Sequence, residues 1–414
     1  MTRDTGTSPP RAGDPYGLGP IGSWIAPVLS VIGLVLIGII TFNLINGDLP
    51  LGVGGNGGTG GNGNGGTGPH LTAAPSNVVV VPKEAAFKGS IVYAKGGNIW
   101  IQTGDQVRQL TADGGASMPS WSPDGSSVYY IRTTAKIGLW PKNGRPAHYD
   151  LDVPDLMTIA ADGSKPPARL LTGGFRRGNL SYSAWVRQPV PSPDGTTIAL
   201  VTDAPNPDQS NIVLQFFDPK AKRLRRATVP DPGIIGQQDP EWRPDGRYLL
   251  YVQNGRDGSR GTPQIFRYDT TTKKARVLSP TGYLQPSYSP DGRYVAATRT
   301  SALGTDVAIL DAGTGAEVAR VTTDGASWAP AWSPAGDGIA FLHIEGQTVD
   351  LRLAKLSCRA PSWTIDQTID LTVVSGLDAA SRPDWFIPSD QLPATPPPPS
   401  FVPSVASPGA STAP

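Results

Sequence analysis

The sequence predicts an all-β chain assembled from repeated four-stranded units, and three observations lead to that prediction. A tight turn of the Ser-Pro-Asp-Gly type joins two apolar segments within 118–131, and the pattern returns at intervals of 44 to 70 residues. The segment after each turn is rich in β-branched and aromatic residues, which favour buried strands. A last half-copy at 383–386 has the first strand of the pattern and lacks the turn. Self-similarity with this period indicates an array of supersecondary units.

The repeated turn has a composition that follows from its backbone. Proline fixes φ at the first central position, aspartate tolerates the second, and glycine accepts a conformation that a Cβ would strain. Carboxylates in such a series could be taken for metal ligands, but their spacing places each one in a different unit. We therefore interpret them as residues that hydrogen-bond their own turn. The predicted structural turn residues are Asp124, Gly125, Asp194, Gly195, Asp245, Gly246, Asp291 and Gly292.

Each unit is predicted to contain four antiparallel strands, called a to d in chain order. Strand a carries a Pro-x-Trp pattern, strand b follows the Pro-Asp-Gly turn, and a second tight turn joins strands c and d. Strands a and b each occur six times, although the first unit lacks strand a and the final half-copy is strand a alone. Trp385 must therefore return beside 91–93 to complete the first unit, which leaves no open edge. The predicted fold is a six-bladed β-propeller over 86–388, closed by the C-terminal strand.

Tryptophans in strand a are expected to pack between neighbouring blades, because they recur at one position of an apolar strand. These residues are Trp121, Trp242, Trp332 and Trp385. His343 follows strand b of a later unit, and we interpret it as a packed residue of that blade.

The residues before the propeller predict one transmembrane helix. The 21 residues of 24–44 are mostly apolar and carry no charge. As a helix, such a run spans about 31 Å, the thickness of a bilayer core. It is longer than the core of a signal peptide, and neither a cleavage site nor a lipidation cysteine follows it. We expect 21–46 to be retained as a signal-anchor helix.

The flanking segments complete the predicted organisation. Residues 1–20 form a polar, disordered N-terminal segment, and 47–85 form a Gly-rich flexible linker with a reach on the order of 35 Å. Residues 389–414 form a Pro/Ser/Ala-rich disordered tail. Positive charges precede the helix and Asp48 follows it, which favours a cytoplasmic N-terminus. The expected location is the cell membrane, single-pass, with the propeller extracytoplasmic.

The composition excludes several classes of function. The formal net charge is +1, so no global field favours nucleic acid. The single cysteine, Cys358, excludes an intrachain disulfide and a cysteine-based metal site, and the three histidines are scattered. Neither a Gly-x-Ser-x-Gly elbow nor a phosphate-binding glycine loop occurs. We therefore expect no cofactor, no metal and no enzymatic activity.

The Pro-x-Trp-Ser-Pro-Asp-Gly hairpin, followed by an apolar strand and an Ala-Asp-Gly turn, resembles the TolB-type β-propeller repeat. The resemblance covers about residues 87–387. It implies a six-bladed propeller in an exported bacterial protein, often an interaction surface. The chain departs from TolB because the predicted anchor replaces an N-terminal α/β domain, so the partner-binding role of TolB is not carried across. The same repeat resembles the non-catalytic half of prolyl-oligopeptidase-like enzymes, whose hydrolase domain has no counterpart here.

An asymmetry in loop length predicts where a partner binds. The a–b and c–d turns share one face and are tight, whereas the b–c and d–a connections share the other face. These connections are long in units two to four, as at 132–155 and 173–188. Loops on a rigid scaffold carry function, and aromatic and arginine side chains are common anchors; insertions without a binding role are the alternative. The predicted binding residues are Trp140, Arg145, Tyr149, Arg176, Arg177, Trp185 and Arg256.

The sequence as a whole predicts a membrane-tethered extracytoplasmic propeller that acts as a binding scaffold in the bacterial cell envelope. Its partners would be the membrane, through 21–46, and an envelope protein or polymer ligand. Two alternatives stay open. A propeller enzyme of the lyase or glycosidase kind would need carboxylates or histidines that converge at the central channel. An extracytoplasmic sensor domain is disfavoured because only residues 1–20 would lie across the membrane.

Overall fold

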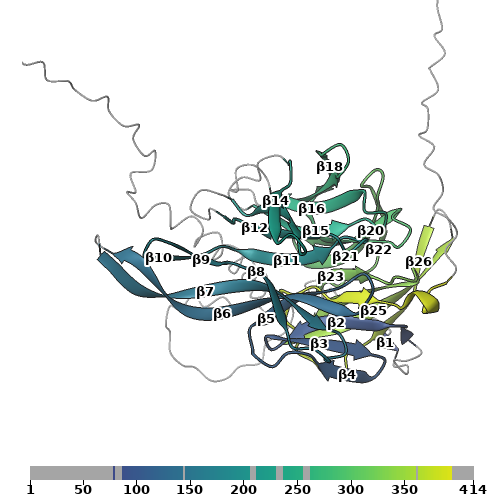
Figure 1. The fold of residues 1–414 in the computed structure, drawn as a ribbon. Coiled ribbons are helices and arrows are strands. Elements are labelled where there is room, and N and C mark those ends of the chain that lie inside the picture. Colours follow the sequence, from purple (N-terminus) through teal and green to yellow (C-terminus); the bar gives the residue numbers. More distant parts are fainter. Residues whose placement is uncertain are drawn as a thin grey trace, which may run out of the picture.

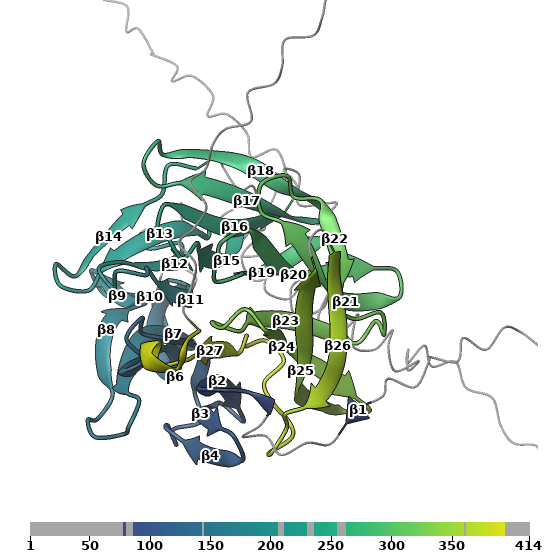
Figure 2. The same cartoon turned by 90° about the vertical axis from the view of Figure 1, so that its right-hand side faces the viewer.

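The structure is a computed structural model, and it describes residues 78–79, 86–142, 145–205, 211–229, 236–254, 262–359 and 362–393. Within these ranges, six sheets of four or five strands are arranged as a ring (Figures 1 and 2). The predicted all-β six-bladed propeller is confirmed. The predicted helix at 21–46 lies outside the described residues, among which no helix is long and apolar enough to span a membrane.

The blades are formed by consecutive strands, and strand a of each blade lies nearest the ring centre (Figure 2). Blade one contains β27 (Asp384–Phe386), β2 (Ser90–Lys95), β3 (Asn98–Thr103) and β4 (Gln106–Gln109). Blade two contains β5 (Ala116–Trp121), β6 (Ser127–Lys142), β7 (Arg145–Ala160) and β8 (Ala168–Thr172). Blade three contains β11 (Val186–Pro191), β12 (Ile198–Thr202), β13 (Val213–Asp218) and β14 (Arg223–Arg226).

The second half of the ring repeats this order. Blade four contains β15 (Gln237–Trp242), β16 (Tyr248–Asn254), β17 (Pro263–Asp269) and β18 (Lys274–Thr281). Blade five contains β19 (Tyr283–Tyr288), β20 (Tyr294–Ser301), β21 (Gly304–Asp311) and β22 (Glu317–Arg320). Blade six contains β23 (Ser327–Trp332), β24 (Gly338–Glu345), β25 (Thr348–Arg359) and β26 (Ser362–Asp370). A short 3₁₀ helix, η1 (Ser389–Gln391), follows β27.

The C-terminal strand closes the ring as the sequence predicts. β27 pairs antiparallel with β2, and Trp385 lies opposite Ile91. The indole of Trp385 packs edge-on against Phe87, with ring centroids 5.8 Å apart, and its Nε1 donates to the carbonyl of Lys88 at 2.8 Å. Blade one is therefore assembled from the two ends of the propeller sequence.

Tryptophans of strand a cross the boundaries between blades. Trp121 of blade two packs on Phe386 of blade one, with ring centroids 5.5 Å apart. Nε1 of Trp242 in blade four donates to the carbonyl of Val190 in blade three at 3.1 Å. These contacts join consecutive blades at their inner strands.

The Pro-Asp-Gly turns are held by their own aspartates. Asp124 Oδ1 accepts from Ser122 Oγ at 2.6 Å and from the Ser126 amide at 3.1 Å. The same two bonds recur around Asp194, and together they lower the pKa of both carboxyls. Gly125 has φ of +69°, the left-handed region in which a Cβ is strained.

The structure corrects the predicted loop at 132–155. β6 and β7 are each 16 residues long and form one hairpin that extends beyond the other strands of blade two (Figure 1). The predicted connection at 173–188 likewise contains a two-stranded sheet, β9 (Gly174–Arg177) with β10 (Leu180–Ser183). The side that was expected to carry loops therefore carries hairpins.

Part of the range predicted as linker is ordered on the propeller. β1 (Val78–Val79) adds a parallel fifth strand to the outer edge of blade six, where Val78 lies opposite Thr368 of β26. An added strand covers backbone groups that an edge strand would otherwise expose.

Candidate functional site

Two places in the described structure gather chemically distinctive side chains: the paired hairpins beside blade two, and the centre of the ring. The first contains several predicted binding residues. We call it the hairpin platform and define it by Tyr149, Phe175, Arg176, Arg177 and Tyr182. β10 packs against both β6 and β7, so the smaller hairpin rests on the larger one (Figure 1).

Aromatic stacking fixes the small hairpin of the platform. Phe175 and Tyr182 lie opposite each other in the β9–β10 register, and their rings stack with centroids 5.2 Å apart and planes 9° apart. The guanidinium of Arg177 lies 5.5 Å and 5.3 Å from these two centroids, within cation–π range. Arg177 Nη2 also donates to the carbonyl of Pro205 at 3.1 Å, which ties the hairpin to the chain after β12.

Polar contacts attach this hairpin to β7. The hydroxyl of Tyr149 donates to the carbonyl of Ser181 at 2.9 Å, and Ser183 Oγ donates to the carbonyl of Asp152 at 2.6 Å. A Cβ on Gly138 would lie 2.7 Å from the Tyr149 ring, so glycine allows the ring to lie across β6. Burial raises the pKa of the Tyr149 hydroxyl, which stays protonated as the donor.

The structure brings together three of the predicted binding residues, namely Tyr149, Arg176 and Arg177. Arg145 is exposed at the start of β7, at the far end of the long hairpin. Trp185 follows β10, and its amide donates to Asp203 at 2.7 Å. Trp140 belongs to β6, but its side chain lies outside what is described, as does the whole of Arg256.

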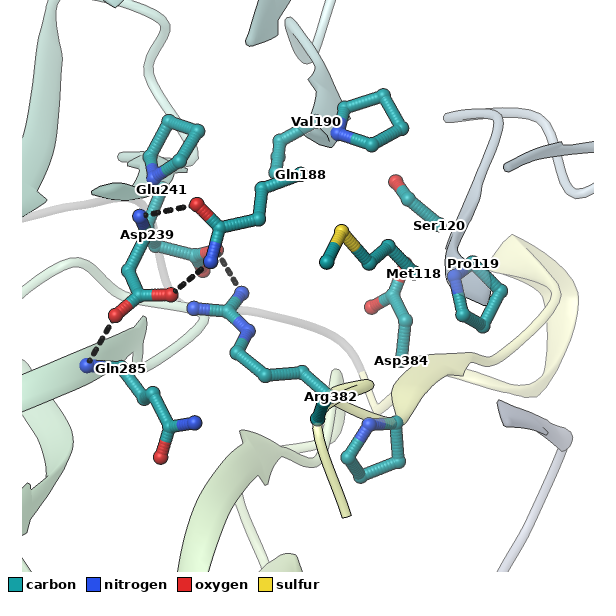
Figure 3. Close-up of a pocket in the computed structure, with 14 residues that line it drawn as sticks. Met118, Pro119, Ser120, Gln188, Val190, Asp239, Glu241, Gln285, Arg382 and Asp384 are labelled. Carbon is teal, nitrogen blue, oxygen red and sulfur yellow. Dashed lines mark hydrogen bonds and ion pairs between the residues drawn. The ribbon is translucent and has the colours of Figure 1, made fainter. Parts of the chain in front are cut away.

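At the ring centre, the residues on either side of the repeat prolines 119, 189, 240 and 383, together with Gln285, line a small cavity (Figure 3). Its volume is about 60 Å³, room for a few water molecules and too little for a sugar ring or a peptide side chain. The polar lining side chains that contact a neighbouring blade are Gln188, Asp239, Glu241, Gln285, Arg382 and Asp384.

A repeated β-bulge presents these side chains to the centre. The pairing of strands a and b shifts register just before the repeat proline in blades two to six. The residue before that proline has a left-handed φ between 51° and 53° in each case: Met118, Gln188, Asp239, Gln285 and Ala329. Bulges re-aim side chains, and non-glycine residues adopt this φ only where surrounding contacts enforce it.

One set of such contacts joins the residues before the prolines. Gln188 Oε1 accepts from the amide of Asp239 at 2.9 Å, and Asp239 Oδ2 accepts from the amide of Gln285 at 3.2 Å. Gln285 Oε1 accepts in turn from the amide of Ala329 at 3.1 Å. Each side chain thus satisfies the bulged amide of the same position in the next blade (Figure 3).

The residues after the prolines make a second set in the same direction. Asp384 Oδ2 accepts from the amide of Trp121 at 2.8 Å, and Glu241 Oε1 accepts from the amide of Tyr288 at 3.3 Å. Ser287 Oγ accepts from the amide of Trp332 at 3.0 Å. The two sets of hydrogen bonds together connect strand a of one blade to strand a of the next.

Arg382 bonds directly to one of the carboxylates of the centre. Its Nη2 donates to Glu241 Oε2 at 3.1 Å, and its Nη1 donates to the carbonyl of Pro286 at 2.8 Å. Burial raises the pKa of Glu241 to about 7 although Arg382 opposes the shift. Burial likewise raises the pKa of Asp239 and of Asp384. Carboxylates therefore do converge at the channel, but they accept hydrogen bonds from backbone amides, Gln188 and Arg382, and Arg187 also acts on the charge of Asp239.

A Ser-His-Asp grouping in blade six lacks the geometry of a catalytic triad. Ser327 Oγ lies 3.0 Å from Nδ1 of His343, and Asp324 Oδ2 lies 3.4 Å from the same nitrogen. In a triad, the nucleophile and the carboxylate contact opposite ring nitrogens. Ser327 is fully buried, and His343 is packed within its blade.

The sequence interpretation missed the channel residues although it contained a signal for them. Glu241 and Asp384 occupy the variable position of Pro-x-Trp, and Asp239 and Arg382 precede the proline. A charged residue in an inner, buried strand indicates a partner within the protein.

Comparisons with known proteins agree with this architecture. No family model matches the chain. The Tol-Pal system protein TolB of Francisella tularensis subsp. tularensis (strain WY96-3418) is 27% identical over 245 residues, which are 56% of this chain and 46% of that protein. The solved structure of a putative TolB from Agrobacterium tumefaciens matches with a TM-score of 0.50 at 15% identity, covering 73% of this chain and 95% of that chain. The fold is a TolB-like six-bladed β-propeller.

A second curated relative matches over a shorter part of the TolB-like propeller. The uncharacterized peptidase YuxL of Bacillus subtilis (strain 168) is 31% identical over 116 residues, which are 27% of this chain and 17% of that protein. The chain spans less than half the length of the curated relatives that it matches.

Proposed function

We propose that this chain is a membrane-tethered, extracytoplasmic TolB-like propeller that binds a protein or polymer of the bacterial cell envelope through the hairpin platform. The observation that carries the proposal is the platform itself. Its two hairpins extend from blade two, and the stacked Phe175 and Tyr182 are clamped by Arg177. A preorganised aromatic and arginine surface loses little entropy on binding, which favours recognition.

Exposed side chains of the two hairpins provide the contact chemistry. Arg145 and Arg176 are exposed, and the relative accessibility of Ile137 on β6 is 76%. The core of an interface is more apolar than the rest of the protein surface, and arginine is enriched in it. The similarity to a Tol-Pal system protein supports a partner in the envelope.

The ring centre favours a scaffold over an enzyme. A lyase or glycosidase would need carboxylates that are free to meet substrate, and those of Asp239, Glu241 and Asp384 accept hydrogen bonds from backbone amides of the next blade. A cavity of about 60 Å³ also leaves no space for a sugar.

The platform is tested by capture with the full-length chain. The double variant Ile137→Ser/Arg176→Ala is expected to weaken partner binding by about 30-fold or more, because loss of a central anchor costs about 2 kcal/mol. A tagged chain is used to capture partners from an envelope extract, and the affinity of the captured partner is then measured. Arg276→Ala changes an exposed arginine of blade four and is the matched control. Equal capture by the double variant would place the binding surface elsewhere.

The proposed anchor has an independent test. If 21–46 spans the membrane and the propeller lies outside, the protein sediments with membranes at its full mass. Protease added to the outer side of the membrane is then expected to cut near the glycine-rich segment and release a fragment that contains the propeller. A soluble form that begins after residue 46, or full protection from external protease, would contradict the proposed topology.

A further inference from the structure

A groove separates blades three and four on the side of the tight turns. This face lies opposite the one on which the predicted binding loops were placed. The Pro-Asp-Gly turns at 193–195 and 244–246 form two of its margins, and β14 and the turn before β18 form the others. Its volume is about 770 Å³. Ligand sites are typically about 300–1,000 Å³. The groove, unlike the ring centre, therefore has the size of a binding site.

Three aromatic rings form the floor of this groove. Phe216 of blade three lies 5.8 Å from Trp242 and 6.0 Å from Tyr268, both of blade four, measured between ring centroids. Phe216 and Tyr268 are buried, and Trp242 is half-buried with its Nε1 bonded to the carbonyl of Val190. The floor is thus a fixed part of the core between the two blades, with one partly accessible indole.

Three cations line the groove above this floor. The guanidinium of Arg225 lies 5.6 Å from the centroid of Phe216, and Arg226 and Lys273 are exposed on opposite sides of the groove. Among the described residues, no carboxylate forms an ion pair with any of the three. Their charges are therefore available to a bound anion.

The two acidic side chains of the groove are already engaged. Asp194 accepts hydrogen bonds from Ser192 Oγ at 2.5 Å and from the Thr196 amide at 3.0 Å, both within its own turn. Asp245 Oδ2 lies 3.2 Å from Nη1 of Arg243. The lining thus combines three cations that pair with no described carboxylate and two carboxylates that internal donors already bond.

We propose that this groove binds an anionic carbohydrate, a glycan segment that carries carboxylate or phosphate groups. Arginine and lysine side chains pair with such groups by charge-assisted hydrogen bonds. The hydroxyls of Thr197 and Thr228 also line the groove and can bond sugar hydroxyls. Trp242 is half-buried and lines the groove, so its accessible part can contact a sugar ring, whereas an apolar peptide side chain would need a pocket that this polar lining lacks. The site is separate from the hairpin platform, and the inference does not depend on the proposed function.

The test uses the full-length chain in detergent and titrates four probes: a hyaluronan hexasaccharide, a phosphorylated mannan oligosaccharide, neutral cellohexaose and a penta-glutamate peptide. The first two distinguish carboxylate from phosphate as the recognised group. The affinity for at least one of the two anionic glycans is expected to fall about tenfold or more in the double variant Arg226→Gln/Lys273→Gln, because two charge-assisted contacts are lost.

The control variant Arg223→Gln/Lys274→Gln removes the same charge from neighbouring exposed positions that do not line the groove. It is expected to bind the anionic glycan within about twofold of the native chain, since non-contacting surface charges act weakly at physiological salt. Equal binding of cellohexaose or penta-glutamate, equal loss in both variants, or no binding of either anionic glycan would overturn the proposal.

Discussion

Truncation after Leu377 is expected to abolish the cooperative unfolding of the propeller. The change removes β27, so β2 loses the inner partner that pairs Trp385 with Ile91. It also removes Asp384, which accepts from the amide of Trp121, and Arg382, which compensates Glu241. The ring then has an exposed apolar edge, which favours aggregation. Calorimetry of the full-length and truncated chains measures the loss of the unfolding transition.

A truncation after Pro393 is the matched control. It keeps β27 and η1, and removes only residues outside the described structure. Its melting temperature is expected to stay within about 2 °C of the full-length value, because surface and tail changes have small effects on stability. If the two truncated chains melt alike, the assignment of 384–386 to blade one is wrong.

Replacement of Arg382 by methionine is expected to reduce the free energy of unfolding by about 3–5 kcal/mol. Arg382 donates to Glu241 and to the carbonyl of Pro286, and methionine can replace neither bond. The carboxylate of Glu241, already raised in pKa to about 7 by burial, would then lose the cation that opposes this shift. The loss, measured by denaturant unfolding, is expected to grow as the pH rises from 6 to 8, because the carboxylate that Arg382 compensates ionises as the pH passes its raised pKa.

A second substitution distinguishes loss of charge compensation from loss of packing. Arg382→Met/Glu241→Gln removes the uncompensated carboxylate, and we expect it to recover at least half of the lost stability. If the free energy of unfolding of the single Arg382→Met variant lies within about 1 kcal/mol of the native value, the bonds of Arg382 to Glu241 and Pro286 contribute little to stability.

The repeat chemistry determined the blades from sequence alone. The Pro-Asp-Gly turn and the apolar strand after it are local features, because a turn is built by neighbouring residues. Five such turns and six copies of strand a were enough to count the blades and to predict that Trp385 returns to 91–93. Sequence reasoning failed where local rules were misleading. The stretch 132–155 is predicted as a long connection between strands b and c, but both strands continue through it as β6 and β7 and form one extended hairpin.

The partners of the central side chains and the presence of the inter-blade groove became apparent only from the tertiary structure. Asp384 accepts a hydrogen bond from an amide that lies 263 positions away in the chain. Glu241 accepts one from Arg382, which lies 141 positions away. No local pattern specifies such partners, because they come together only when the ring closes. The groove arises in the same way, since Arg226 and Lys273 belong to different blades and share one space only through the packing of Phe216 on Tyr268. Sequence fixes a repeating unit through short-range backbone preferences, whereas burial, compensation of charge and the shape of a site depend on which units become neighbours.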